Sequence, residues 1–151
     1  MRLLLPVKLF LRMEGYGLYT MKQACEKTGL SYETLKFYCN QGLIPYVKRD
    51  ELNRRVFSEK NIAWINSLGC LKNCGMGIRE MREYLDLCMQ GEGTIPERKV
   101  MLDAKRVELE QELKRVQDSI AYIDWKQGFY DDILAGRQKY YSNLTPETNE
   151  D

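Results

Sequence analysis

The chain has 151 residues, 44% of them hydrophobic, which is enough to build the core of one domain of ordinary size. Its net charge of +1 is unevenly distributed: residues 1–60 carry eleven Lys and Arg against six Asp and Glu, whereas residues 61–151 carry twelve against sixteen. A basic N-terminal half favours a polyanionic partner over chance clustering on a solvated surface. The sequence contains no histidine, which excludes Ser-His and Cys-His nucleophilic catalysis.

The five cysteines indicate a reducing compartment. They stand at positions 25, 39, 70, 74 and 88, within segments that are predicted to be helical. An odd number with no C-x-x-C pair argues against a secreted disulfide framework. The same lack of a C-x-x-C motif argues against a thiol oxidoreductase. We therefore expect a cytoplasmic protein that is not an enzyme.

Residues 1–18 are expected to be a disordered N-terminal extension. The first twelve resemble a short signal peptide, but Lys8 and Arg12 interrupt the apolar run and no small-residue cleavage site follows. The run is also too short to span a bilayer. No membrane partner is therefore expected.

Two short helices joined by a tight turn are predicted next, over residues 21–27 and residues 32–41. Thr20 and Ser31 are good N-cap residues, and Gly29 suits the end of the first helix. This arrangement is the signature of a helix-turn-helix.

A small hairpin, or wing, is predicted over residues 47–57 from its alternating segments around a polar turn. Ser58 then caps a third helix, which breaks at residues 75–77, and a fourth runs from residue 78 to about residue 88. Together these elements predict a winged helix-turn-helix domain over residues 19–89.

A long charged helix is predicted to begin near Pro96 and to run to about Lys126. It carries a heptad pattern, in which one set of positions recurs every seven residues and a second set follows each by four. The first set is Leu102, Leu109, Val116 and Ile123, and the second is Arg106, Leu113, Ile120 and Gln127.

Such a seam needs a partner helix, which the chain does not supply elsewhere. Residues 95–128 are therefore expected to pair with the same helix of a second copy, antiparallel or parallel. The alternative is a helix that folds back on its own domain. Residues 129–151 are predicted to form a C-terminal tail, with a disordered acidic end from Thr145.

A resemblance to the MerR family of bacterial transcription regulators is carried by two runs, YTMKQACEKTGLSYETLKFYCNQGLIP and NRRVFSEKNIAWINSLGCLKNCGMGIREMREYL. The resemblance implies a mainly α fold: a winged helix-turn-helix with a β-hairpin wing, a second helical wing and a long antiparallel dimerisation helix. It implies a homodimer on an inverted-repeat promoter operator in double-stranded DNA, with RNA polymerase as a partner, and activation by untwisting an overlong promoter spacer. Lys36 and Phe37 stand where Arg and Tyr are usual in the family, and Cys39 where an acidic residue is usual.

In a helix-turn-helix the second helix enters the major groove, so we expect Tyr32, Glu33 and Lys36 to face base edges. Hydroxyls and cations near this helix are expected to bind phosphates. These are Ser31, Thr34 and Tyr38 on the helix, Arg54 and Arg55 in the wing, and Lys72 in the second wing. Tyr38 is equally compatible with a place in the core.

Cysteine is the candidate sensor. Metal-sensing relatives place two cysteines just after the long helix, but residues 124–151 have none, so no metal and no cofactor is expected. Cys70 matches the position of a cysteine in the branch that responds to reactive aldehydes or thiol oxidants, and Cys74 is a weaker candidate. Lys72, if close in space, would favour reaction of the thiolate.

The alternative for both thiols is simple packing. Three rival functions remain open. The protein could be a regulator with a small-ligand site among the aromatic residues of the tail, a regulator with no dedicated inducer site, or a coiled-coil adaptor that does not bind DNA.

Overall fold

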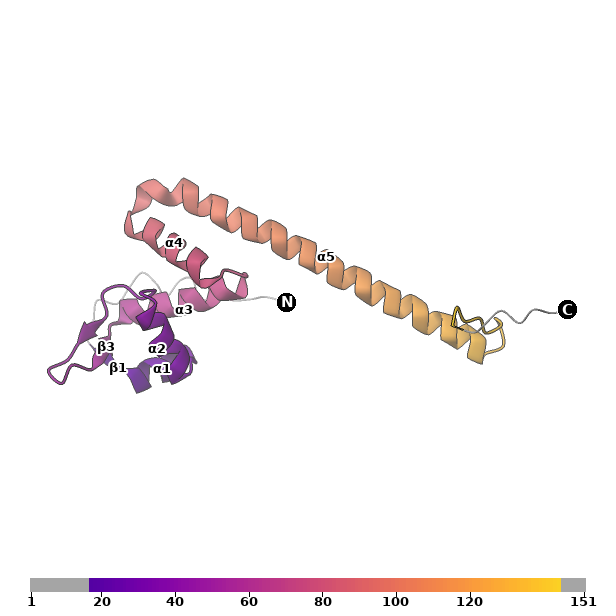
Figure 1. Ribbon diagram of the computed structural model, residues 1–151, viewed down its shortest axis with the longest axis horizontal. Coiled ribbons are helices and arrows are strands. Elements are labelled where there is room, and N and C mark those ends of the chain that lie inside the picture. The colour runs from indigo at the N-terminus through magenta and orange to yellow at the C-terminus, as the bar shows by residue number, and fades with distance from the viewer. Residues whose placement is uncertain (1–16, 145–151) are drawn as a thin grey trace. The chain divides into compact units, whose positions relative to one another are not determined.

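The computed structural model describes residues 17–144 (Figure 1), so most of the predicted N-terminal extension and the acidic end of the tail lie outside the described residues. The chain divides into two compact units, residues 1–106 and residues 107–151. The elements, in chain order, are β1 (Tyr19–Thr20), α1 (Met21–Thr28), α2 (Tyr32–Asn40), β2 (Lys48–Arg49), β3 (Arg55–Phe57), α3 (Glu59–Asn73), α4 (Ile78–Met89), the short 3-10 helix η2 (Glu92–Thr94) and α5 (Ile95–Leu134).

Local capping explains why α1 and α2 begin and end where the sequence predicts. The Thr20 hydroxyl accepts from the Gln23 N–H, and the Gln23 side chain accepts from the Thr20 N–H, which forms a capping box. Gly29 ends α1 in the left-handed region at φ 71°, where glycine meets no Cβ penalty. Ser31 then caps α2 through the Thr34 N–H. The predicted helix-turn-helix is therefore present.

The predicted wing is also present, but it belongs to a larger sheet. β3 lies between β1 and β2 and pairs antiparallel with both, with Val56 opposite Thr20 on one side and Lys48 on the other. In the turn, the Asp50 carboxylate accepts from the N–H groups of Leu52 and Arg54. β1 was not predicted, because two residues carry no alternation and their partner strand is far along the chain.

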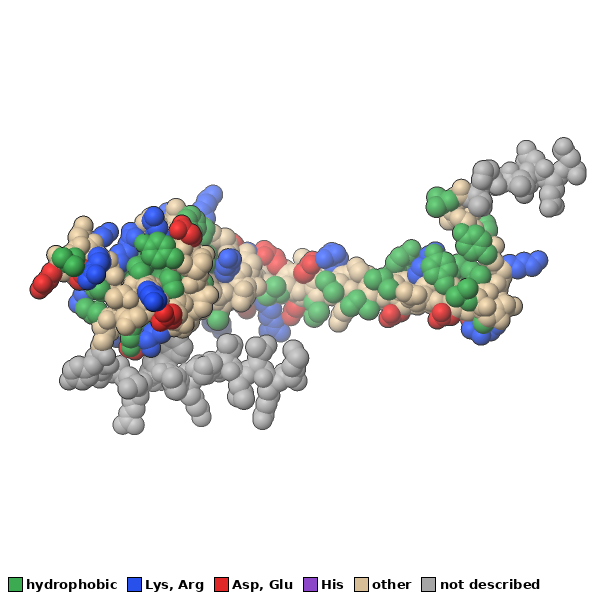
Figure 2. All heavy atoms as spheres, turned by 90° about the horizontal axis from the view of Figure 1, so that it is seen from below, with side chains coloured by type: hydrophobic (Ala, Val, Ile, Leu, Met, Phe, Trp, Pro, Cys, Tyr) green, Lys and Arg blue, Asp and Glu red, His purple; other side chains and the backbone are tan. Residues whose placement is uncertain are grey.

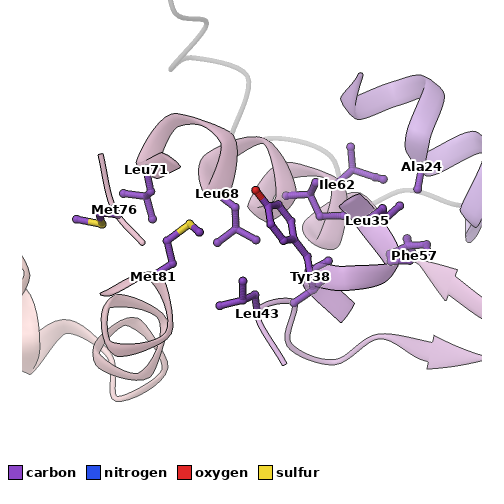
Figure 3. Packing of buried hydrophobic residues seen from close by; sticks show 12 residues of the cluster. Ala24, Leu35, Tyr38, Leu43, Phe57, Ile62, Leu68, Leu71, Met76 and Met81 are labelled. Carbon is purple, nitrogen blue, oxygen red and sulfur yellow. The ribbon is translucent and has the colours of Figure 1, made fainter. Parts of the chain in front are cut away.

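The core of the first unit joins α1, α2, β3, α3 and α4 (Figure 3). Its largest fully buried side chains are Phe57, Leu35, Leu43, Ile65, Leu68 and Met81. Asn61 is the one buried polar side chain among the described residues; its amide donates to the Pro45 carbonyl at 2.8 Å and its oxygen accepts from the Ser58 N–H at 2.9 Å. Trp64 donates to the Leu43 carbonyl at 2.7 Å. The bonds from Asn61 to Pro45 and from Trp64 to Leu43 hold the segment after α2 against α3.

The start of α5 is fastened to α4. Arg98 donates to the Gly91 carbonyl at 2.8 Å, and Lys105 forms an ion pair of 2.7 Å with Glu80. Glu80 also accepts from the Gly77 N–H at the beginning of α4. Met101 packs against the core. The first turns of α5 are therefore part of the first unit.

The long helix is longer than the sequence predicts. It continues to Leu134, so the predicted end near Lys126 is wrong and the first residues of the predicted tail, from residue 129, are helical. The helix ends where Gly136 takes φ 73°, with the Ala135 N–H bonded to the Asp131 carbonyl. None of the described side chains of α5 is buried, and Figure 2 shows uncovered hydrophobic side chains along it. No described helix is long and apolar enough to cross a membrane.

Candidate nucleic-acid interface

The second helix of the helix-turn-helix presents one side to the core and the other to solvent. Leu35 and Tyr38 point inward, whereas Tyr32, Lys36 and Phe37 are exposed. At 3.6 residues per turn the exposed positions form a stripe along the helix. This stripe includes the predicted base-reading residues Tyr32, Glu33 and Lys36, so the structure leaves all three accessible.

A hollow of about 420 Å³, here the wing-side hollow, lies between α2, the beginning of α1 and the wing. Most of the charged side chains that line it are cations. Its lining residues are Thr20, Met21, Lys22, Tyr32, Arg49, Asp50, Arg54, Arg55 and Val56. Four cations against one carboxylate, beside the N-terminus of a helix, make a favourable environment for a phosphate.

The wing arginines are held in place by neighbours. Arg54 forms an ion pair with Asp50 at 2.8 Å, and the Arg54 main-chain N–H together with its guanidinium lowers the pKa of the Asp50 carboxyl. Arg49 donates to the Asn53 carbonyl at 2.7 Å. Arg55 donates to the Asn40 side chain at 2.8 Å, which ties the wing to the last residue of α2. Each guanidinium keeps further N–H donors beyond these bonds.

A second hollow, also about 420 Å³ and here called the turn-side hollow, lies beside α2 next to the turn between α3 and α4. Its lining is mainly apolar, with one cation and one carboxylate. The lining residues are Glu33, Thr34, Phe37, Tyr38, Lys72, Met76, Gly77, Ile78 and Met81. Lys72, predicted to belong to the second wing, therefore lies beside α2, which is the recognition helix of the helix-turn-helix.

The hydroxyls predicted to bind phosphate differ in accessibility. Ser31 and Thr34 are outside the core, but they are engaged with each other, since their hydroxyl oxygens lie 2.9 Å apart and Ser31 caps the helix. The Tyr38 side chain is 3% exposed and its ring packs among Leu35, Leu43 and Leu68 in the core (Figure 3). Burial favours the packing role for Tyr38 over the phosphate role.

The structure adds residues that the sequence did not single out. Lys22 and Arg49 join the wing-side hollow, and Arg82 of α4 donates to the Gln41 carbonyl at 2.5 Å and to the Gln41 side chain at 3.1 Å. Arg82 thus binds the C-terminal cap of α2, where a cation suits the helix dipole. No local pattern marks these residues, because the wing-side hollow and the bonds of Arg82 bring together segments that are far apart in the sequence.

The cysteines occupy different environments. Cys70 is exposed on α3, but Cys74 is the C-cap of α3 and lies outside the helix, contrary to the prediction that all five cysteines are helical. Lys72 is two residues after Cys70, and side chains at that spacing do not face each other on a helix. Burial raises the pKa of the half-buried Cys25 and Cys39 thiols. Within residues 17–144, no cluster of three or more possible ligands could hold a metal ion.

An exposed helix between two hollows, one lined by a cationic hairpin, defines a winged helix-turn-helix DNA-binding protein. Residues 19–88 match the family model of the MerR HTH family regulatory proteins. The chain is 33% identical over 133 residues to an uncharacterized HTH-type transcriptional regulator of Haemophilus influenzae, with 87% of this chain and 98% of the relative covered. The chain therefore belongs to the MerR family.

Solved structures show the same similarity. A crystal structure of HiNmlR, a MerR family regulator that lacks the sensor domain and is bound to promoter DNA, matches with a TM-score of 0.65 and 32% identity, over 79% of this chain and 94% of that one. A MerR family regulator from Listeria monocytogenes matches with a TM-score of 0.68 and 32% identity, over 80% and 91%. The protein is a DNA-binding transcriptional regulator and not an enzyme, as the sequence predicted.

Proposed function

We propose that two copies of this chain pair through α5 in the cytoplasm and bind an inverted repeat in promoter DNA, where RNA polymerase is the partner. The uncovered apolar seam of α5 is the observation that carries the proposal. Its six apolar members are Leu102, Leu109, Leu113, Val116, Ile120 and Ile123, and their side chains are 38–57% exposed. The free cysteines of the described chain are compatible with a reducing compartment.

The seam is large enough to support a dimer. Full burial of a Val, Leu or Ile side chain is worth about 1.5–3 kcal/mol, so covering the exposed half of each gains roughly 1 kcal/mol. Six side chains from each of two copies then contribute on the order of 10 kcal/mol before the entropic cost of association. The 40 residues of α5 give a helix about 60 Å long, which leaves room for four heptads.

On the DNA, α2 lies in the major groove with Tyr32 and Lys36 toward base edges. Arg54 and Arg55 bind the backbone on the wing side, and Lys72 binds it on the other side. Ser31 and Thr34 share their hydroxyls between the helix cap and a phosphate, and Tyr38 supports the helix from the core. The structure of HiNmlR bound to promoter DNA supports promoter DNA as the partner of this chain. Activation follows the family mechanism, in which the bound dimer untwists the promoter spacer.

Cys70 is the proposed sensor, and Cys74 is the weaker candidate. The Cys70 thiol is exposed on α3, whose last turn leads to the turn-side hollow and Lys72. An alkylated or oxidised thiol at this position adds bulk near the end of α3, so it is well placed to alter how Lys72 meets the DNA. A regulator with no dedicated inducer site is the competing assignment.

The dimer is tested by a matched pair of substitutions two residues apart on α5. Leu113→Lys places a charge in the seam and should convert the dimer to a monomer in light scattering at micromolar concentration. Gln111→Lys introduces the same side chain off the seam and should leave the dimer intact. Retained helicity in circular dichroism shows that both variants fold. A dimeric Leu113→Lys protein would contradict pairing through the seam.

The DNA and sensing assignments are tested by footprinting the promoter DNA upstream of the protein's own coding region, with and without an α,β-unsaturated aldehyde. Protection of an inverted repeat is expected. An aldehyde response in wild type and in Cys25→Ala, but not in Cys70→Ala, would identify Cys70 as the sensor. Equal responses in all three proteins would exclude it.

A further inference from the structure

Phe37 is a large apolar side chain on the exposed stripe of the recognition helix. It is 45% exposed, and it is absent from both the buried core and the partly buried residues packed against the core. The centroid of its ring lies 6.3 Å from that of Tyr38, the next residue along the helix, which is buried in the core. Phe37 therefore contributes little to the core for its size, and the fold gives no reason for an aromatic residue there.

Its neighbours indicate a non-ionic contact. Phe37 lines the turn-side hollow with Thr34, Met76 and Ile78, and the charged groups at this hollow are Lys72 and Glu33. The wing-side hollow, across α2, has four cations. Phosphate binding is therefore strongest on the wing side, and the Phe37 side offers an apolar surface next to a single cation.

The apolar feature that duplex DNA presents in its major groove is the 5-methyl group of thymine, and phenylalanine is one of the side chains that contact it. Phe37 follows Lys36 and stands one helical turn after Glu33, so it shares the exposed stripe with the three predicted base-reading residues, of which Tyr32 is the third. The phenyl ring has no hydroxyl and so cannot donate a hydrogen bond to a phosphate.

We propose that Phe37 is a specificity-determining residue that contacts the 5-methyl group of a thymine in each half-site of the operator. The inference rests on the proposed placement of α2 in the major groove. It assigns Phe37 to direct base readout and leaves backbone positioning to the cations of the two hollows. The contact discriminates thymine from uracil, which has the same hydrogen-bonding groups without the methyl.

The test replaces each thymine of the footprinted half-site by deoxyuridine, one position at a time and in both half-sites together. Binding is measured by fluorescence polarisation. For wild type, one thymine should show a loss of about fourfold per half-site, because burying one methyl-sized group is worth about 0.8 kcal/mol. Phe37→Ala should bind the all-thymine operator more weakly and should not distinguish thymine from uracil at that position.

Two further variants separate this role from a structural one. Phe37→Leu keeps an apolar surface and should retain part of the discrimination. Lys36→Ala should keep the full thymine preference while it changes affinity. The slope of log affinity against log salt should be the same for Phe37→Ala as for wild type, because the lost contact is not ionic.

The proposal is overturned if no thymine of the half-site is sensitive to uracil, or if folded Phe37→Ala retains the wild-type sensitivity. A variant that binds the operator normally but fails in transcription would instead place Phe37 against RNA polymerase. Loss of operator binding by wild type itself would refute the proposed function rather than the role of Phe37 alone.

Discussion

The wing-side hollow allows a quantitative prediction about salt. Arg55 is proposed to bind a phosphate, and it also donates to Asn40 at the end of α2. Arg55→Ala removes both contacts, whereas Asn40→Ala removes only the bond that positions the guanidinium. The two variants should therefore weaken operator binding in ways that differ in salt dependence.

Each phosphate contact contributes about −0.9 to the slope of log affinity against log salt. Arg55→Ala removes one such contact from each copy of the dimer, so between 50 and 200 mM KCl the fourfold rise in salt should cost this variant about 12-fold less affinity than it costs wild type. Asn40→Ala should bind about twofold to fivefold more weakly than wild type at both salt concentrations, as expected for one lost hydrogen bond. Its slope should remain that of wild type.

Fluorescence polarisation with the operator and with a random duplex measures both effects. Lys99→Ala, which removes an exposed cation of α5 outside both hollows, serves as the control and should keep the wild-type slope. A wild-type slope for Arg55→Ala would refute the phosphate contact. A changed slope for Asn40→Ala would refute the division between positioning and charge.

Three further predictions concern the framework of the interface. Asn61→Ala should lower the free energy of unfolding in urea, at fixed protein concentration, by about 3 kcal/mol, because it leaves the part-buried Pro45 carbonyl without its donor and the Ser58 N–H without its acceptor in the capping box of α3. A loss under about 1 kcal/mol would contradict this. Hydrogen bonds from Lys105 and from the Gly77 N–H lower the pKa of Glu80, so its contribution to stability is present above the ordinary value of 4.5 and is lost as pH falls through the lower folded value. Wild type should thus be more thermally stable than Glu80→Gln at pH 7, and the difference should shrink below pH 4.5. A difference in stability that does not change with pH would exclude a contribution from the ionised Glu80 carboxylate. Arg82→Ala should weaken operator binding, because the C-terminal end of α2 is then no longer held by the bond from Arg82 to Gln41. Arg82→Lys should restore part of the affinity, and neither variant should change the salt slope. Full affinity of Arg82→Ala would exclude a positioning role.

The parts of the fold that were predictable depend on local signals. Thr20, Ser31 and Gly29 act within one turn of their own helices, so the bounds of α1 and α2 could be predicted to within a residue or two. The wing was predictable because its turn stands between the two strands that pair. β1 was not, because it depends on pairing with a strand more than thirty residues away. The end of α5 was placed too early because the heptad pattern stops before the helix does.

The candidate interface was predictable only in part. The amino-acid pattern determined the helix-turn-helix, the basic wing and the apolar seam, since capping, charge and heptad spacing are properties of neighbouring residues. Tertiary structure decided that Tyr38 lies in the core, that Phe37 remains outside it, and that Lys22 and Arg49 join Arg55 around one hollow. It also decided the bonds from Arg55 to Asn40 and from Arg82 to Gln41, which join residues 15 and 41 positions apart. Contacts of that kind form only when the packed core brings distant segments together, so no pattern in neighbouring residues predicts them.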